Sequence, residues 1–449
     1  MSSMGRGYIV EECVEKYLTN LSAAAGSCET GLFIGQCSAQ RDFVVLAVRT
    51  PHRETEGATE SQRTPILLDN IDVEWVAEHA RQVSRMLPGG VSVLGLFLIA
   101  PPEVSKEVQN TLKKLVFAVD KSISKSKLWD PSEDDVTERI TLHICSKTRK
   151  AVCKTFDVKD PKCSAKPADW KYQSGISSSW PLITCNVQLD LQIPVTSENV
   201  DKFIKDGLRN WAKQIESALC LINGKAVTDD SELLSGPKKS TKASQQQTVR
   251  AQILVSADDA DAGQVSSAVV KECSGSVCLR GVVHCRAYIH TNKPKTRHAA
   301  QALKRDVVNT VFSRVEMLLE DLLMNEADLA SGEQVLPRRV FAPISGSGLS
   351  VCDYIFPDES TADVAERFKE MLGCDLPEED VDTSMEAQTC YSVSGVEDGC
   401  DEEANHNVPT QSGAETVPKT KAARQYAGMA VAAAVALLAT ATSLLYLTE

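Results

Sequence analysis

The sequence lacks several features that assign a protein to a common functional class. Its first residues, Met1–Val10, include Arg6 but no apolar stretch of the kind that forms the core of a secretory signal. It also lacks an excess of positive charge: the formal net charge is −13, which argues against a broad basic surface for nucleic acid. No Gly-x-Ser-x-Gly nucleophile elbow and no dinucleotide-binding glycine fingerprint occurs. We therefore expect a cytosolic protein that binds no nucleic acid and carries none of these catalytic motifs.

The 15 cysteines lack the tight, repeated spacing of a disulfide framework. A secreted protein would pair them, whereas the reducing cytosol leaves them as small buried hydrophobic residues. One group invites a zinc interpretation: Cys273, Cys278, His284 and His290, with Cys285 alongside. Its spacing matches no known zinc finger, and the segment alternates like a hairpin with Gly275 and Ser276 at the turn. We favour the hairpin, and we expect no metal and no cofactor.

One long apolar run is present near the end of the sequence. The twenty-one residues from Ala427 to Leu447, with Val435 near their middle, carry no charge. At about 1.5 Å rise per residue, a helix of this length spans roughly 30 Å, the thickness of a hydrocarbon core. Positive flanking charge stays in the cytosol, and the run is preceded by Lys419, Lys421 and Arg424. It predicts a single C-terminal transmembrane helix that inserts after synthesis and leaves the body in the cytosol.

The residues around this run bear on the choice of membrane and on the approach to it. Only Thr448 and Glu449 follow, and the lack of basic residues there favours the endoplasmic reticulum over mitochondria. Before the run, the stretch from Cys374 to Pro418 contains twelve acidic residues and no Lys or Arg. With few aromatics and many small polar residues, it buries too little surface to fold alone. We predict an acidic, disordered tether over residues 374–426, with a docking site for a basic partner as the alternative.

Alternating strand and helix patterns predict an α/β (α+β) fold for the rest of the chain. We expect a first domain over residues 1–228, a linker over 229–248 and a second α/β domain over 249–373, without an internal repeat. Val91–Ala100 is almost continuously apolar, as in a strand buried on both faces. Apolar spacing predicts helices over Glu103–Ser122, Asp201–Leu221 and Thr296–Met324.

An aromatic segment of the first domain, Asp169–Trp180, is a candidate partner interface. It places Trp170, Tyr172 and Trp180 among small polar residues between strands. Exposed aromatics among adaptable polar groups suit a protein interface. Equally, two Trp side chains can simply fill the end of a core, and that alternative remains open at this point.

Two segments of the first domain resemble the strand signatures of the MPN (JAB/MPN/Mov34) domain: Glu29–Gly35 and Val93–Pro101. In catalytic members of that family a His-x-His pair follows the second strand and binds zinc, and a Glu near the first strand acts as the base. The two His positions correspond to Leu98 and Ala100, which cannot ligate a metal. Glu29 would then have no zinc-bound water to activate. The resemblance implies an MPN-like domain that is used for binding.

Several further motifs resemble the odorant-response-abnormal protein four family, and the terminal run completes the match. These motifs are Tyr8–Glu12, Gly31–Cys37, Gln82–Gly90, Pro167–Gly175 and Cys285–His290. The resemblance implies a protein that helps a subset of G-protein-coupled receptors, odorant receptors among them, to fold or leave the endoplasmic reticulum. It also implies a pairing with the cysteine protease of the ubiquitin-fold modifier, which the family holds at that membrane. In that pair the catalytic residues belong to the partner.

Three functions compete at this point. A non-catalytic, tail-anchored adaptor needs a cytosolic body, an anchor and no active-site set. A tail-anchored, metal-dependent isopeptidase of the MPN type would need zinc ligands that Leu98 and Ala100 do not supply. A membrane-remodelling protein would need amphipathic or coiled-coil surfaces, which the sequence does not show. We favour the adaptor, as a single-pass protein of the endoplasmic reticulum membrane.

Overall fold

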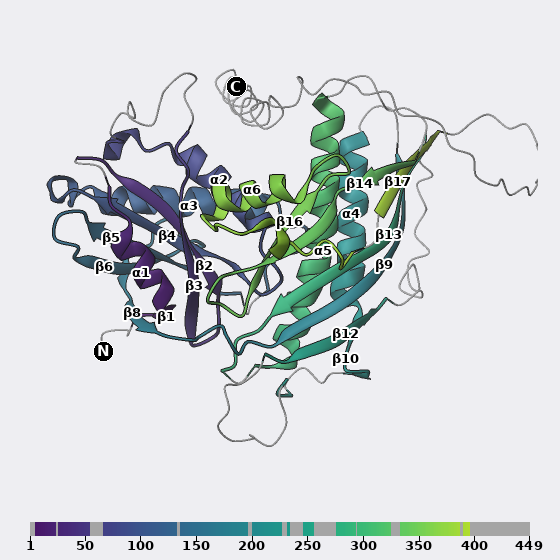
Figure 1. Cartoon of the computed structure of the whole chain (residues 1–449), viewed down its shortest axis with the longest axis horizontal. Helices are drawn as coiled ribbons and strands as arrows, with labels where there is room; N and C mark the ends of the chain where they lie inside the picture. Colours follow the sequence, from purple (N-terminus) through teal and green to yellow (C-terminus); the bar gives the residue numbers. More distant parts are fainter. Residues whose placement is uncertain are drawn as a thin grey trace, which may run out of the picture. The chain divides into compact units, whose positions relative to one another are not determined.

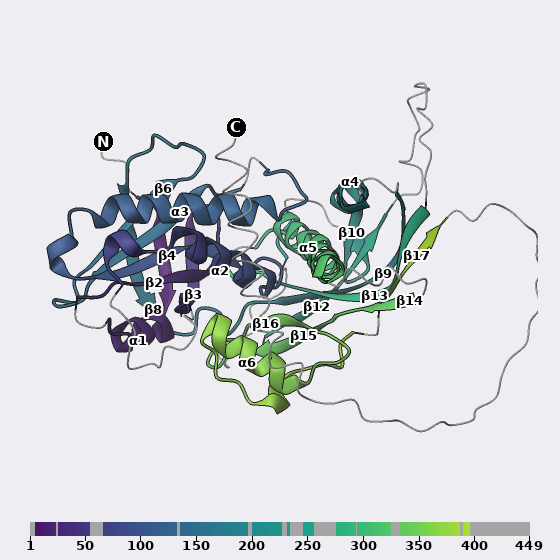
Figure 2. The same cartoon turned by 90° about the horizontal axis from the view of Figure 1, so that it is seen from above.

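Two large β-sheets organise the part of the chain that the computed structural model describes. That part comprises residues 5–23, 26–53, 66–132, 135–195, 200–226, 231–233, 246–255, 275–292, 294–324, 333–386 and 389–395. All of these residues lie in one compact unit, Met1–Val396, and the second unit, Glu397–Glu449, lies outside them. Figures 1 and 2 show the two sheets and the helices that cover them.

The first sheet has eight strands in the order β7-β6-β5-β4-β2-β3-β1-β8. β4 (Ser92–Ala100) lies near its middle, and all but the first residue of this strand are buried. The expected strand buried on both faces is therefore confirmed. The other strands are β1 (Gly7–Glu11), β2 (Glu29–Gln36), β3 (Arg41–Arg49), β5 (Glu138–Cys145), β6 (Ala151–Asp157), β7 (Lys166–Pro167) and β8 (Asp169–Gln173).

Helices cover both faces of the first sheet. α1 (Glu12–Asn20) packs on one face, while α2 (Val73–Arg85) and α3 (Val108–Lys125) pack on the other (Figure 2). The Asp72 side chain caps α2 by accepting a hydrogen bond from the Trp75 amide at 3.0 Å. α3 begins five residues later than expected, at Val108 instead of Glu103. Pro101 and Pro102 precede it, and the short 3₁₀ turn Pro102–Val104 takes the place of the first helical turn.

The second sheet has seven strands in the order β11-β10-β12-β9-β13-β17-β14. Its centre is the antiparallel pair of β9 and β13, which stay in register along the whole of both strands. The strands are β9 (Leu182–Val195), β10 (Leu219–Ile222), β11 (Lys225–Ala226), β12 (Thr248–Leu254), β13 (Gly275–Tyr288), β14 (Glu333–Leu336) and β17 (Thr389–Gly395).

α4 (Val200–Ser217) and α5 (Thr296–Met324) cover one face of the second sheet, and the expected bounds of α5 are confirmed. A small unit lies on the opposite side, as Figure 2 shows. It consists of the hairpin β15 (Arg338–Pro343) and β16 (Ser350–Ile355) and of α6 (Thr361–Leu372). Apolar residues of this unit, such as Val340 and Phe368, share one core with Leu32 of the first sheet.

The expected boundary between two domains does not divide the sheets. β9 and β10 belong to the second sheet, although both precede the expected linker over residues 229–248. The reason is the long pairing of β9 with β13, which joins residues about ninety positions apart. The expected helix Asp201–Leu221 is also too long. It ends at Ser217, because Leu219–Ile222 pairs with β12 as a strand.

The folded body also extends beyond the expected start of the tether at residue 374. Glu378–Asp380 forms a 3₁₀ turn, Val381 and Glu386 are buried, and β17 pairs with both β13 and β14. The acidic composition is misleading here, because the carboxylate of Glu386 is buried and forms an ion pair with Arg314. The remainder of the predicted tether, from residue 396, lies outside the described residues.

Candidate functional site

Leu98 and Ala100, which stand where the MPN resemblance would place the zinc-binding His pair, lie on β4 at the centre of the first sheet. β2 and β4 are neighbours there, with Glu29 opposite Ile99 and Thr30 opposite Leu98. The side chains of Leu98 and Ala100 are fully buried in a small apolar cluster. Its other members are Cys28, Leu68, Val108 and Leu112. Where the resemblance would place imidazole ligands, the protein therefore has the packed hydrocarbon side chains of Leu98 and Ala100, which cannot ligate a metal.

Glu29, the residue at the position of the catalytic base, is also buried and already has a partner. One carboxylate oxygen lies 3.6 Å from His52 Nε2. The neighbouring Cys28 is no substitute nucleophile, since burial and then the charge of Glu29 raise the pKa of its thiol to about 11. Among the described residues, no group of three or more His, Cys, Asp or Glu side chains is placed to hold a metal ion.

The second candidate for zinc is a continuous strand in the structure. Cys278 and His284 both lie on β13, six residues apart, and at about 3.3 Å per residue their positions are separated by roughly 20 Å. His284 is occupied by neighbours: its Nδ1 lies 2.7 Å from Asn186 Oδ1, and its Nε2 accepts a hydrogen bond from Arg286. Cys273 lies outside the described residues.

The alternative of a hairpin turn at Gly275 and Ser276 is wrong. Both residues lie within β13, where they pair with Val195 and Pro194 of β9. Alternation of buried and exposed residues is the same in a hairpin arm and in a long single strand, so the sequence pattern could not separate the two.

The structure separates the three aromatic residues of the candidate partner interface. Trp180 is only 1% exposed and packs edge-on against Phe43, so it belongs to the core. Trp170 and Tyr172 lie on β8, the last strand of the first sheet, and Tyr172 is 39% exposed. Of the proposed interface, only the pair on β8 is therefore in a position to meet a partner.

Between these aromatics, the chain folds around a buried carboxylate. Glu11, at the end of β1, accepts hydrogen bonds from the amides of Gly175, Ile176 and Ser177 at 2.6, 2.9 and 3.2 Å. The Ser177 hydroxyl lies 2.8 Å from that of Ser347 in the β15–β16 hairpin. The polar residues of the segment 174–177 thus have a structural task, which is to join the first sheet to the hairpin.

Gln36 joins the two sheets directly. Its side-chain amide donates to the carbonyl oxygens of Gly90 and Tyr288 at 2.8 and 2.6 Å. Its carbonyl oxygen accepts from the His290 amide at 2.6 Å. One buried side chain thereby satisfies three backbone groups from two distant segments of the chain.

The turn before β4 fits the second sheet so closely that it needs glycine. A Cβ atom on Gly89 would come within 2.4 Å of the Ala302 carbonyl oxygen, and one on Gly90 within 2.2 Å of that of Tyr288. Gly90 also has a φ of +80°, which other residues rarely adopt. In return, the Gly89 amide donates to the Arg286 carbonyl at 2.9 Å, and the Tyr288 amide donates to the Gly89 carbonyl at 2.9 Å.

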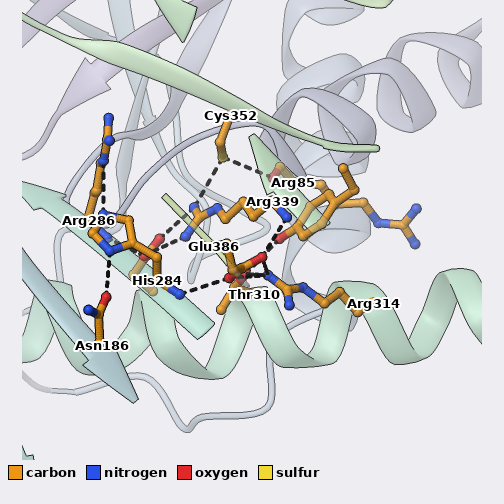
Figure 3. Close-up of polar contacts among 11 residues, drawn as sticks. Arg85, Asn186, His284, Arg286, Thr310, Arg314, Arg339, Cys352 and Glu386 are labelled. Carbon is orange, nitrogen blue, oxygen red and sulfur yellow. Dashed lines mark hydrogen bonds and ion pairs between the residues drawn. The ribbon is translucent and has the colours of Figure 1, made fainter. Parts of the chain in front are cut away.

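A buried polar network continues from this junction, and Figure 3 shows its side chains. Arg339 donates two hydrogen bonds to the Asp306 carboxylate at 2.7 and 2.9 Å, and both side chains are 1% exposed. Burial alone would lower the pKa of Arg339, but the Asp306 charge raises it well above its usual value. Arg339 also donates to the Cys352 sulfur at 3.1 Å.

Glu386 closes the network from the end of the folded body (Figure 3). Its carboxylate accepts from Arg314 at 2.6 and 2.5 Å and from the backbone amides of His284 and Arg339 at 2.8 and 2.7 Å. Burial, followed by the charges of Arg286 and Arg339, lowers the pKa of His284 to about 4. The imidazole is therefore neutral at physiological pH and adds no charge to this already charged interior.

Sequence reasoning missed this network, although α5 carries a signal for it. The predicted apolar face of the helix includes Leu303, Val307 and Val311, and it packs on the second sheet. A second row, Asp306, Thr310 and Arg314, is spaced by four residues and is equally buried. This signal is ambiguous, because a polar row beside an apolar face is also what a helix with a solvated face shows, and the burial of the row therefore could not be predicted.

The residues of the predicted membrane anchor, Ala427, Val435 and Leu447, lie outside the described residues. Among the residues that the structure describes, no helix is long and apolar enough to cross a membrane. The anchor therefore stays a prediction of the sequence.

Comparison with known proteins identifies the relatives of this chain. Residues 31–383 match the sequence profile described as "ODR4-like: Odorant response abnormal 4-like". The chain belongs to this family. Human "Protein odr-4 homolog" is 48% identical over 408 residues, which cover 87% of this chain and 88% of the human protein. The mouse protein of the same name is 45% identical and covers 99% of this chain and all of its own length.

A more distant relative and a solved structure were also matched. "Odorant response abnormal protein 4" of Caenorhabditis elegans is 22% identical, covering 78% of this chain and 73% of its own. Among solved structures, the crystal structure of UfSP from C. elegans aligns with 82% of this chain and 57% of its own, at 8% identity and a TM-score of 0.40. The profile match includes Gln36, Gly89, Gly90 and the strand end at Tyr288, so the junction between the sheets lies within the family's shared region.

Proposed function

We propose that this chain is a non-catalytic adaptor, held on the cytosolic face of the endoplasmic reticulum membrane by a single C-terminal helix. There it assists the folding or trafficking of a subset of G-protein-coupled receptors of the odorant type. It also holds the cysteine protease of the ubiquitin-fold modifier at that membrane. The family match supports the adaptor role, and a relative's printed name, with its reference to odorant response, supports the link to receptors.

The observation that carries the non-catalytic part of the proposal is the core around Leu98 and Ala100. Both side chains are fully buried and surrounded by apolar neighbours, so a zinc ion could not be held there without rebuilding the centre of the sheet. On this interpretation the first sheet and its helices form an MPN-like domain that has kept the scaffold and lost the metal site. The protease step then belongs to the partner.

The protease partnership rests on the family resemblance of the motifs from Tyr8 to His290. Structure supports a body of fixed geometry, because Gln36, Gly89 and Glu386 connect the two sheets and the hairpin unit through buried hydrogen bonds. A rigid body suits an adaptor, which must present two partners without adding conformational entropy to the cost of binding.

The experiment that tests this proposal is the identification of proteins that co-purify with the detergent-solubilised full chain. Mass spectrometry should find the ubiquitin-fold-modifier protease at near-equal amounts and odorant-type receptors at lower amounts. The same purification from cells that express the chain with Gly89→Leu, which cannot form the junction, is the matched control. Absence of the protease from the wild-type sample would contradict its assignment as a partner.

The alternative, a tail-anchored metal-dependent isopeptidase, makes an opposite prediction. We expect the purified chain to contain no stoichiometric zinc and to cleave no isopeptide substrate. Elemental analysis and a cleavage assay check this. One zinc ion per chain would contradict the non-catalytic assignment.

A further inference from the structure

We propose that the groove between α6 and the turn that follows it binds a basic, partly apolar segment from the cytosolic side of a client receptor. This inference rests on the adaptor function proposed above and names the surface that would serve the receptor. The groove is open to solvent and has a volume of about 700 Å³. Figure 2 shows α6 at the outer margin of the hairpin unit, away from the second sheet.

Two walls of different kinds form the groove. One is the outward side of α6, where small alanine side chains let a segment approach the helix closely. The other is the chain beyond α6, which includes the start of the 3₁₀ turn Glu378–Asp380 and adds apolar surface from a leucine and a proline. The described lining residues are Ala362, Ala365, Glu366 and Lys369 of α6, and residues 375–379 beyond it.

The core and the backbone beneath the groove hold both walls in place. α6 begins with a capping box between Ser360 and Asp363, and its Phe368 side chain is fully buried in the shared core. Beyond the second wall, the Asp382 amide donates to the Phe341 carbonyl at 2.8 Å, and the Phe341 amide donates to the Asp382 carbonyl at 3.2 Å. The groove is therefore formed before a partner binds, which reduces the conformational entropy lost on binding.

The charge of the groove identifies the kind of segment that fits it. Residues 358–386, which contain α6 and the turns on either side of it, include eleven acidic and two basic residues, a formal charge of −9 within −13 for the whole chain. Of the described residues that line the groove, Lys369 alone is cationic, and it pairs with Asp375 at 3.2 Å. In the described part of the chain, three lining carboxylates form no ion pair: those of Glu366, Glu378 and Glu379. These carboxylates complement a segment that carries Lys and Arg.

Cytosolic segments of multi-pass membrane proteins have this chemistry. Their cytosolic loops carry an excess of Lys and Arg, and these loops continue into apolar helices, so basic residues stand beside apolar ones. A G-protein-coupled receptor presents several such segments on the face of the membrane where the adaptor is proposed to lie. By contrast, a second copy of this acidic chain and an anionic lipid surface both carry negative charge, which the groove would repel.

Charge reversal in the full chain tests the groove. Glu378→Lys together with Glu379→Lys replaces two lining carboxylates by ammonium groups, and we expect it to reduce the amount of co-purifying odorant-type receptor by about tenfold or more. The control is Glu107→Lys together with Asp206→Lys, which changes the net charge equally at exposed positions outside the groove and should leave that amount unchanged. The amount of co-purifying protease should be the same in both variants, and equal melting temperatures show that the fold is intact.

A photo-crosslinking amino acid at Ala362, in the otherwise unchanged full chain, supplies a second measurement that decides the matter even if the charge-reversed variant does not fold. Irradiation of membranes should join this position to a Lys- and Arg-containing cytosolic segment of an odorant-type receptor, which mass spectrometry of the cross-linked peptides locates. Cross-links to the protease, to a second copy or to another part of this chain would assign the groove to that occupant and overturn the inference. Wild-type capture of the receptor by the charge-reversed variant, or equal losses in that variant and its control, would also overturn it and leave the adaptor function standing. A wild-type chain that captures no receptor would refute both.

Discussion

Gln36 is the residue on which the junction between the two sheets most depends. It is 5% exposed and supplies hydrogen bonds to three backbone groups of the turn at Gly90 and the end of β13. Replacement by an apolar residue of similar size leaves all three groups buried without partners. Each orphaned group costs free energy because its hydration in the unfolded chain is not replaced.

We therefore expect Gln36→Leu to lower the free energy of unfolding by about 2 to 4 kcal/mol. Urea unfolding followed by circular dichroism measures this. Gln188→Leu is the control, because Gln188 is exposed on β9 and its replacement should change stability by less than about 0.5 kcal/mol. Equal stabilities of the two variants would show that the junction does not contribute.

Three buried histidines make stability depend on pH. Burial is the main cause that lowers the pKa values of His79, His284 and His290 to about 4 each. The unfolded chain binds protons on these residues near pH 6.5, whereas the folded chain does so only near pH 4. Their contribution to stability is therefore complete above pH 6.5 and is lost progressively as the pH falls toward 4.

The change is about 1.4 kcal/mol per pH unit for each histidine within that window. His79→Gln, which can still donate to the Met371 carbonyl that His79 Nε2 contacts at 2.9 Å, should reduce the slope by the share of one histidine. Unfolding free energies measured at several pH values between about 4.5 and 7 check this, because the histidines titrate differently in the folded and unfolded chain over this range. An unchanged slope in the variant would show that His79 titrates normally.

Among the elements, those set by local sequence patterns could be predicted, whereas those set by contacts between distant parts of the chain could not. α5 could be predicted because apolar residues such as Leu303 and Val307 recur at helical spacing. The pairing of β9 with β13 could not, because no local pattern records which distant strand a strand will meet. For this reason the boundary expected within residues 229–248 does not coincide with the division between the two sheets.

The candidate site shows the same division. The loss of zinc ligands at Leu98 and Ala100 could be read from residue identity, and the structure adds only that both are packed. By contrast, Trp170 and Trp180 have the same chemistry in sequence, and only the arrangement of strands makes one an edge residue and the other a core residue. The prediction from composition placed Glu386 in a solvated tether, because composition does not distinguish a carboxylate in a buried ion pair from one in solvent.

The ion pair between Glu386 and Arg314 ties the end of the folded body to α5. A chain that ends at Gly395 retains the pairing of Glu386 with Arg314, whereas a chain that ends at Gly373 lacks the carboxylate that accepts hydrogen bonds from the buried Arg314 guanidinium. We expect the shorter chain to be less stable by about 3 to 5 kcal/mol, or to aggregate. Arg314→Met should restore part of the loss in the shorter chain and destabilise the longer one. Equal stability of the two truncated chains would show that the tether begins at residue 374 after all.

In the whole molecule, we assign binding to the folded body and location to the anchor. The run from Ala427 to Leu447 is mainly Ala, Leu and Val, with little polar side-chain chemistry for recognising another helix.

A chain that ends at Thr420 should stay in the cytosol, while the full chain should pellet with membranes and resist carbonate. Val435→Arg should weaken insertion, because Arg at the middle of a helix costs about 2.5 to 3.5 kcal/mol. A glycosylation acceptor added after Glu449 should be glycosylated in the lumen. Absence of this glycosylation would contradict the predicted orientation, with the body in the cytosol.

The most direct test of this division of roles replaces residues 425–449 by an unrelated tail anchor of the same membrane. The measured quantity is the amount of the ubiquitin-fold-modifier protease that co-purifies with the chimera from the membrane fraction. We expect the wild-type amount, and we expect the body ending at Thr420 to bind the protease without bringing it to membranes. Loss of the protease from a chimera that is still at its membrane would contradict the account, because binding would then depend on the anchor itself.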